Sequence, residues 1–111
     1  MDTKKDIITS GGETISTVEV ENTIFQHPDV LEVAVVSKPD PEWGEVPKAF
    51  VVPKPGSSPT AEAITSFCKE QLPRLKAPVT VTFGELPKTA TGKIQKYKLH
   101  DREWEGHPPK A

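Results

Sequence analysis

Residues 30–36 read Val-Leu-Glu-Val-Ala-Val-Val, a valine-rich run in which apolar and polar side chains alternate imperfectly. Residues 48–52, Lys-Ala-Phe-Val-Val, share its β-branched and aromatic character. Such side chains pack well on a pleated surface, so both runs are predicted to be strands. Residues 79–83 alternate strictly and predict a third strand with one buried face. The proline-rich residues 38–47 are expected to form a loop between the first two strands.

An amphipathic helix is predicted before the first of these strands. Residues 16–19 form a capping box, in which Ser16 and Glu19 satisfy each other's end of a new helix. This helix should end at His27-Pro28, because proline disfavours helical backbone in the residue before it. Its apolar residues, which we expect to pack, recur at roughly helical spacing and are Val18, Ile24 and Phe25.

A second helix is predicted after Thr60, which is a favourable N-cap residue. Apolar side chains recur there at the i, i+3, i+4 and i+8 spacing of one helical face. They are Ile64, Phe67, Cys68 and Leu72. Cys68 is the only cysteine, so no intrachain disulfide can form, and we expect it in the core rather than in catalysis. A last helix is expected near residues 96–104.

The N-terminal residues predict a β-hairpin. Residues 6–9 and 13–15 have strand character and are joined by Ser10-Gly11-Gly12, where glycine tolerates the positive φ of a tight turn. The glycines either only make this turn or also allow a ligand to approach the backbone closely. The element order predicts one α+β domain over residues 1–105, with a small three-stranded sheet covered by helices and an N-terminal two-stranded hairpin. Residues 106–111 are expected to be a flexible tail.

Length and charge narrow the classes of function. The 111 residues are about one domain, and a net charge of -2 provides no long-range field that would gather nucleic acid. No apolar run approaches the ~20 residues of a membrane helix, and the charged N-terminus lacks the apolar region of a secretory signal. The three histidines are not spaced as a metal site. We therefore expect no nucleic-acid partner, no membrane span and no metal site.

The most informative motif lies near the C-terminus. Residues 86–96 read Leu-Pro-Lys-Thr-Ala-Thr-Gly-Lys-Ile-Gln-Lys and place Lys93 on a turn of small residues between two apolar anchors. This lysine belongs either to an ordinary basic loop or to a site that presents a cation to an anionic ligand. Lys88 and Lys96 are expected to be its solvated flanks.

Two segments, taken together, resemble the C-terminal domain of acyl-CoA synthetases, which belong to the adenylate-forming superfamily. They are residues 5–21, with the glycine hairpin, and residues 86–94, with the Thr-Gly-Lys turn, about 70 residues later. The sequence between them, including Trp43-Gly44-Glu45, is similar as well, so the resemblance covers about residues 5–99. It favours the ligand-facing interpretation of the lysine.

The resemblance implies an ATP-dependent ligase that joins a carboxylic acid to coenzyme A through an acyl adenylate. ATP, Mg²⁺ and coenzyme A would be bound mainly by a larger N-terminal adenylation domain, so this chain alone is expected to be inactive. Lys93 matches the lysine that serves adenylation, where a cation stabilises the developing charge on phosphorus. Gly92 is a weaker nucleotide-contacting candidate.

The resemblance also implies a second working face for thioester formation. Lys5, with Asp6, matches the hinge about which the small domain rotates. Gly12 matches the glycine at the coenzyme A tunnel, with Gly11 and Glu13 as further coenzyme A contacts. Thr14 is a weak nucleotide-contacting candidate.

Several alternatives stay open. A stand-alone interaction module of the same fold, without chemistry, is the other hypothesis, because the sequence begins close to the hinge position. Fatty, aromatic and short-chain acids are all compatible, since the acyl pocket belongs to the N-terminal domain. The final Pro-Lys-Ala only distantly resembles the peroxisomal Ser-Lys-Leu address, which leaves the cytoplasm and the peroxisome as candidate compartments.

Overall fold

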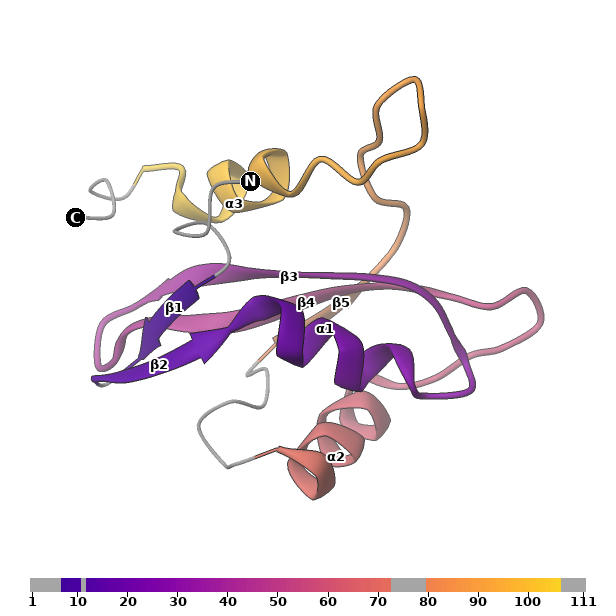
Figure 1. The fold of residues 1–111 in the computed structure, drawn as a ribbon, viewed down its shortest axis with the longest axis horizontal. Helices are drawn as coiled ribbons and strands as arrows, with labels where there is room; N and C mark the ends of the chain where they lie inside the picture. Colours follow the sequence, from indigo (N-terminus) through magenta and orange to yellow (C-terminus); the bar gives the residue numbers. More distant parts are fainter. Residues whose placement is uncertain (1–6, 11, 73–79, 107–111) are drawn as a thin grey trace.

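The computed structural model describes residues 7–10, 12–72 and 80–106 of the chain, which fold as an α+β domain (Figure 1). In chain order the elements are β1 (Ile7–Ser10), β2 (Glu13–Ser16), α1 (Thr17–Phe25), β3 (Val30–Asp40), β4 (Gly44–Pro53), α2 (Ala61–Gln71), β5 (Thr80–Phe83) and α3 (Lys96–Trp104). None of the described helices has the length and apolar character needed to cross a membrane. The predicted domain and tail extend beyond the described ranges, and so does Val79 of the predicted third strand.

The strands form two separate sheets. β1 and β2 pair antiparallel as a hairpin, and β3, β4 and β5 form a three-stranded sheet with β4 at its centre. β4 pairs antiparallel with β3 and parallel with β5. The predicted hairpin and three-stranded sheet are therefore confirmed, and β3 and β5 are the edges of the larger sheet.

The prediction of a loop at residues 38–47 is wrong. β3 and β4 continue through most of this segment, up to the pair Asp40↔Gly44. Pro39 is tolerated because it lies on an edge strand. Pro47 lies beyond the stretch of β4 that pairs with β5, so its missing N–H breaks no bond to that strand. The turn itself is closed by Asp40, whose Oδ1 accepts two backbone N–H groups at 2.8 and 2.9 Å.

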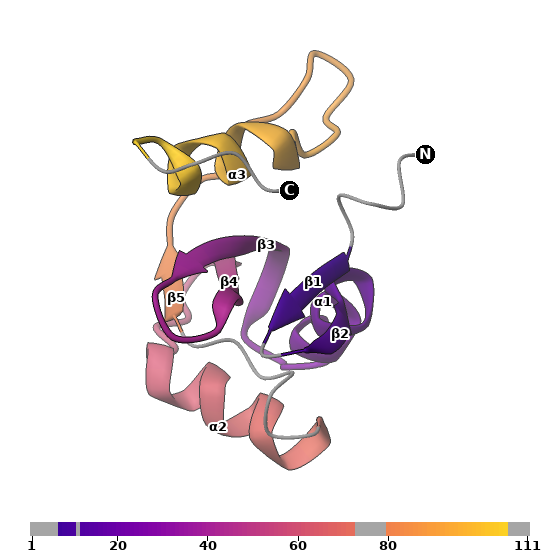
Figure 2. The ribbon, with the colours of Figure 1, turned by 90° about the vertical axis from the view of Figure 1, so that its left-hand side faces the viewer.

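Both faces of β3 and β4 are buried, which is why their sequences are nearly continuous apolar runs. α1, α2 and the hairpin cover one face, and α3 covers the other (Figure 2). The larger core, on the first face, contains Ile8, Ile15, Val20, Ile24, Val30, Val35, Ala49, Val51, Ile64 and Cys68. The smaller core, under α3, contains Ala34, Val36, Phe50, Leu86 and Leu99.

Helix α1 begins at the position predicted from its capping residues. Ser16 Oγ accepts the backbone N–H of Glu19 at 3.3 Å. Its buried face carries Val20 and Ile24. The expectation that Val18 and Phe25 also pack is wrong, because these side chains are 43% and 59% exposed. They lie seven residues apart on one face, roughly 100° away from that of Ile24, because each residue turns the helix by about 100°.

Helix α2 follows the prediction closely. Thr60 Oγ1 accepts the Ala63 N–H at 3.0 Å as the N-cap. Ile64 and Cys68 are fully buried in the larger core, and Phe67 meets the His27 ring edge-on at 5.2 Å between centroids. Burial raises the pKa of the Cys68 thiol to about 11, as expected of a cysteine that acts as a small hydrophobic residue.

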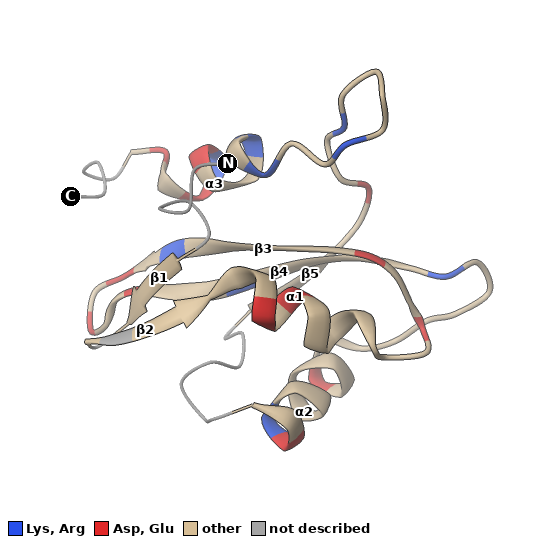
Figure 3. Cartoon of the chain, in the orientation of Figure 1, with Lys and Arg blue, Asp and Glu red and all other residues tan. Residues whose placement is uncertain are grey.

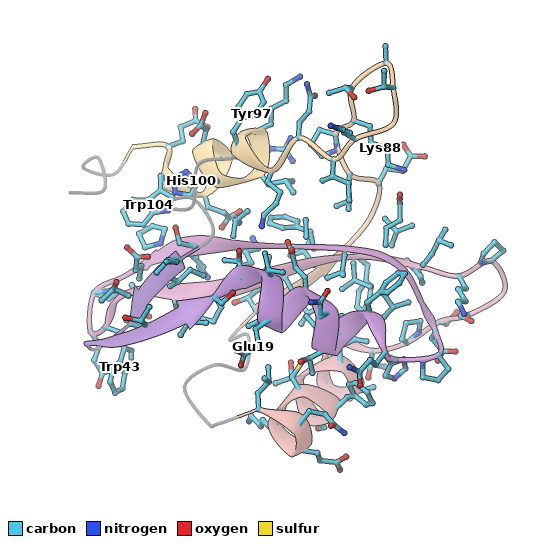
Figure 4. All side chains as sticks on the ribbon, in the orientation of Figure 1. Glu19, Trp43, Lys88, Tyr97, His100 and Trp104 are labelled. Atoms are coloured by element: carbon cyan, nitrogen blue, oxygen red, sulfur yellow. The ribbon has the colours of Figure 1, made fainter. Side chains whose placement is uncertain are left out.

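Helix α3 is held on its face of the sheet by contacts of mixed character. Leu99 is buried in the smaller core. Trp104 lies against the end of β3 (Figure 4), and its Nε1 donates to the carbonyl and the hydroxyl of Ser37 at 3.1 and 3.0 Å. Lys48 of β4 forms an ion pair with Glu103 at 2.8 Å. Polar contacts therefore add to the small apolar contact that holds α3 on the sheet.

Candidate functional site

The Thr-Gly-Lys motif forms a closed loop between β5 and α3. Its two anchors are seated in the smaller core, where Leu86 is buried and Ile94 is partly buried. Lys88 and Ile94 form an antiparallel bridge, and the Gln95 N–H donates to the Pro87 carbonyl at 2.8 Å. The two ends of the loop are therefore joined by backbone hydrogen bonds where the loop leaves the domain.

Thr89 braces the tip of this loop against Lys93 from two sides. The Thr89 N–H donates to the Lys93 carbonyl at 2.9 Å, and the Lys93 N–H donates to Thr89 Oγ1 at 3.1 Å. The Gly92 N–H donates to the Thr89 carbonyl at 2.9 Å, and its φ of +89° is one that L side chains rarely adopt. The backbone of Lys93 is thus fixed by local hydrogen bonds.

The ammonium of Lys93 is presented differently from those of its neighbours. Lys93 is exposed, and within the described part of the chain its ammonium makes no hydrogen bond or ion pair. Lys88 pairs with Glu32 at 2.6 Å, and Lys96 pairs with Glu21 at 2.9 Å. The expectation of a solvated flank is wrong for Lys96, which is partly buried against its acid, whereas Lys88 is exposed as expected although it also pairs with an acid far away in sequence.

These lysines lie on the face of the sheet opposite α2. Figure 3 shows basic residues on the loop, and both basic and acidic residues along α3 and on the strands beneath it. Figure 4 shows Lys88 at the base of the loop, where the chain leaves the body of the domain. The loop carries Lys93 outward from a base at which Lys88 and Lys96 are each paired with an acid.

The glycine hairpin is built on the larger core. Ile8 and Ile15 are fully buried and face each other across the β1–β2 ladder. The Thr9 N–H donates to Glu45 Oε1 at 3.1 Å, which ties β1 to β4. Apolar burial and one buried acid thus fix the base of the hairpin.

Gly12 lies at the turn of the hairpin. It is exposed with φ +88°, and a Cβ atom built there would have no neighbour within 4 Å among the described residues. Glu13 begins β2, and Thr14 is exposed on the same strand. The positive φ explains why the turn uses glycine, whereas no residue in the described part of the domain crowds this position.

The structure keeps the two predicted working faces apart. Figures 1 and 2 show the Lys93 loop beyond α3 on one face of the sheet and the hairpin tip on the other side of the domain. The predicted hinge residues Lys5 and Asp6, and Gly11 of the hairpin, lie outside the described residues. Lys93 and Gly12 are therefore not placed to reach one reacting centre at the same time.

Sequence reasoning missed the long-range partners of this site. Glu21 and Glu32 were not singled out, and neither was the tie between Glu45 and the hairpin. No local spacing marks them, because each acid reaches a group on another element. Among the described residues there is also no group of three or more His, Cys, Asp or Glu side chains that could hold a metal ion.

Comparison with known proteins gives consistent matches. The family model described as AMP-binding enzyme C-terminal domain matches residues 19–93. An acetate–CoA ligase of Humulus lupulus is 56% identical over 103 residues, which are 88% of this chain and 18% of that protein. A peroxisomal acetate/butyrate–CoA ligase of Arabidopsis thaliana is 50% identical over 112 residues, 96% of this chain and 20% of that protein.

A solved structure shows the same fold. An anthranilate CoA ligase in complex with anthranoyl-AMP superposes with a TM-score of 0.79 at 44% sequence identity. The match covers 88% of this chain and 20% of that one. The chain thus spans about a fifth of the length of the relatives it matches.

Proposed function

Because the chain belongs to the AMP-binding enzyme C-terminal domain family, we propose that it works as the mobile C-terminal domain of an ATP-dependent carboxylic acid:CoA ligase. The observation that carries the proposal is the contrast among the lysines of the loop. Lys88 and Lys96 are neutralised by acids, whereas the Lys93 ammonium is exposed at the tip of a braced loop. A cation displayed in this way suits an anionic partner supplied by another domain.

In the adenylation step, a carboxylate oxygen of the substrate attacks the α-phosphorus of ATP, and the bond from that phosphorus to pyrophosphate breaks. Negative charge grows on the oxygens around phosphorus as the bonds exchange. The Lys93 ammonium would stabilise that charge, a contribution of about 3–4 kcal/mol for a well-placed donor. Because the loop backbone is already fixed, little reorganisation is required when the charge develops.

In the thioester step, the thiol of coenzyme A attacks the acyl carbonyl carbon, and AMP leaves with the electrons of the acyl–phosphate bond. We assign the hairpin to this step, with Gly12 and Gly11 at the path of the thiol arm and Glu13 beside them. Thr14 and Gly92 are weaker candidates for contact with the nucleotide. Since the hairpin and the lysine loop lie apart, rotation about Lys5 and Asp6 would exchange them at one active site.

The remaining parts of the machinery belong to a larger N-terminal adenylation domain. It would bind ATP with Mg²⁺, coenzyme A and the carboxylic acid, and the isolated chain, residues 1–105 with a tail at 106–111, would be inactive. Two relatives named above are ligases of acetate and of acetate or butyrate, and a third is a ligase of anthranilate, which supports short-chain and aromatic acids as candidate substrates. The peroxisomal relative supports the peroxisome, beside the cytoplasm, as a candidate compartment.

Replacement of Lys93 in the full-length ligase tests this proposal. We expect Lys93→Ala to slow ATP–pyrophosphate exchange by about 10²–10³-fold, the usual cost of losing one transition-state donor. Thioester formation from preformed acyl adenylate should change little, because that step uses the hairpin. Lys98→Ala is the matched control, since Lys98 is an exposed lysine on α3. An unchanged exchange rate in Lys93→Ala would contradict the proposed role.

If the chain were instead a stand-alone interaction module, it would not support catalysis at all. Adding it to a ligase truncated before the C-terminal domain tests this second hypothesis. Recovery of pyrophosphate exchange by the wild-type chain, but not by Lys93→Ala, would establish a catalytic role in trans. Binding to the truncated ligase without any recovery of activity would favour the interaction module.

A further inference from the structure

A hydrogen-bonded cluster joins the segment after the lysine loop to the helix after the hairpin. Lys96 Nζ lies 2.9 Å from Glu21 Oε2 and donates to Thr17 Oγ1 at 3.1 Å. Glu21 Oε2 also accepts the Val35 N–H at 2.8 Å. We define these contacts of Thr17, Glu21, Val35 and Lys96 as the junction cluster, which connects α1, β3 and α3.

The position of this cluster in the chain gives it significance. Thr17 follows directly on Ser16, the last residue of the hairpin, and Lys96 is the third residue after Lys93. The two contacting residues, 79 positions apart in sequence, thus lie close in sequence to the end of the hairpin and to the lysine loop. Any displacement of Lys96 relative to Thr17 would be passed to the lysine loop.

The side chains of the junction cluster are largely shielded from solvent. The side chains of Lys96 and Glu21 are 27% and 18% exposed, and Thr17 is fully buried. An ion pair with this shielding and two additional hydrogen bonds is less screened than an exposed pair. Its geometry is also specified, because Glu21 is fixed by a backbone N–H on the free edge of β3.

Helix α3 needs such an attachment at its start. Its N-cap residue, Gln95, makes no side-chain capping hydrogen bond, unlike the caps of α1 and α2. The other ion pairs of this layer hold different points, since Lys88–Glu32 ties the loop to β3 and Lys48–Glu103 ties the far end of α3 to β4. The junction cluster attaches the first residue of α3 to α1.

We propose that Lys96 is a positioning residue for adenylation, which holds the Lys93 loop at a fixed place relative to α1 through Glu21 and Thr17. This inference rests on the proposed function of Lys93. Loss of the tether would leave the hairpin in place, because Ile8 and Ile15 seat it in the larger core. The lysine loop would be misplaced, and misplacement by about 1 Å can cost about 10²-fold in rate.

The test uses four variants of the full-length ligase: Lys96→Met, Lys96→Arg, Glu21→Gln and the control Lys98→Met. Lys96→Met should lower kcat for pyrophosphate exchange by about 10–100-fold while KM for ATP stays within about twofold, because the bound nucleotide is held elsewhere. Lys96→Arg keeps a cation with several donors and should recover most of the lost rate. Thioester formation from preformed acyl adenylate and the control should be unaffected.

Two further measurements separate positioning from a merely structural role. The double variant Lys96→Met/Glu21→Gln should lose no more rate than the more damaged single variant, because both remove one interaction. Hydrogen exchange should rise in residues 86–96 and not in residues 7–16. Additive losses, equal losses in both half-reactions, or no recovery with Lys96→Arg would overturn the inference.

Lys93→Ala, measured in parallel, separates a failure of the positioning role of Lys96 from a failure of the proposed function. If Lys93→Ala slows pyrophosphate exchange and Lys96→Met does not, the positioning role fails and the proposed function stands. If Lys93→Ala leaves pyrophosphate exchange unchanged, the proposed function fails, and the positioning role fails as well because it rests on that function. Slow exchange in both variants, with the pattern above, supports both.

Discussion

The two predicted working faces are attached to the same sheet by different physical means. The hairpin is seated by Ile8 and Ile15, which are fully buried in the larger core together with residues of α1 and α2. The lysine loop rests on a smaller core and depends on ion pairs and hydrogen bonds to the body of the domain. The position of a face held by buried apolar side chains should change mainly when their volume is changed. The position of a face held by polar contacts should change when a single hydrogen bond is removed.

The largest expected effect comes from opening each core in turn. Ile15→Ala removes a fully buried side chain and should lower the free energy of unfolding by about 2–5 kcal/mol. Leu99→Ala opens the smaller core and should cost about 2 kcal/mol, the low end of that range, because α3 can relax separately from the rest. Urea unfolding measures both, and Val18→Ala, at an exposed site, is the control.

Hydrogen exchange sharpens the same comparison. Leu99→Ala should raise exchange in α3 and in residues 86–96 while β1 and β2 stay protected. Ile15→Ala should raise exchange across the whole domain. A larger loss of stability in Leu99→Ala than in Ile15→Ala, or a uniform rise in exchange, would show that the two faces are not held differently.

A smaller effect is expected from one hydroxyl in the loop. Thr89→Val keeps the shape of the side chain but removes the acceptor of the Lys93 N–H, a bond of about 1 kcal/mol. We expect pyrophosphate exchange to fall by about fivefold, the rate equivalent of that energy. Thr89→Ser, which retains the oxygen, should remain close to the wild type. Equal rates in the two variants would mean that the brace at Thr89 does not position Lys93.

The sequence predicted those features that depend on local patterns. The caps at Ser16 and Thr60 form as expected, and Cys68 is buried. The family inferred from the glycine hairpin and the Thr-Gly-Lys turn is confirmed by the match to residues 19–93. In each case the signal lies within a few neighbouring residues, or in a motif of fixed order.

The features that sequence reasoning missed depend on contacts between distant elements. Pro39 and Pro47 suggested a loop, but strand order decides whether a missing N–H matters, and that order is not visible locally. Lys96 was expected to be solvated, but Glu21 meets it from another helix. The roles of Lys93 and Gly12 remain predictions, because an exposed side chain or turn shows its partner only in the complete active site.

The central claim is that one small domain carries two faces that serve two different half-reactions. The most direct measurement compares Lys93→Ala with Gly12→Asn in the full-length ligase, using pyrophosphate exchange for adenylation and transfer from preformed acyl adenylate for thioester formation. L side chains rarely adopt the φ of +88° at Gly12, but asparagine is enriched at positive φ, so it disturbs the turn less than other residues while its side chain tests close approach of a ligand. We expect Lys93→Ala to impair adenylation alone and Gly12→Asn to impair thioester formation alone. If either variant lowered both half-reactions equally, the assignment of one face to each step would be contradicted.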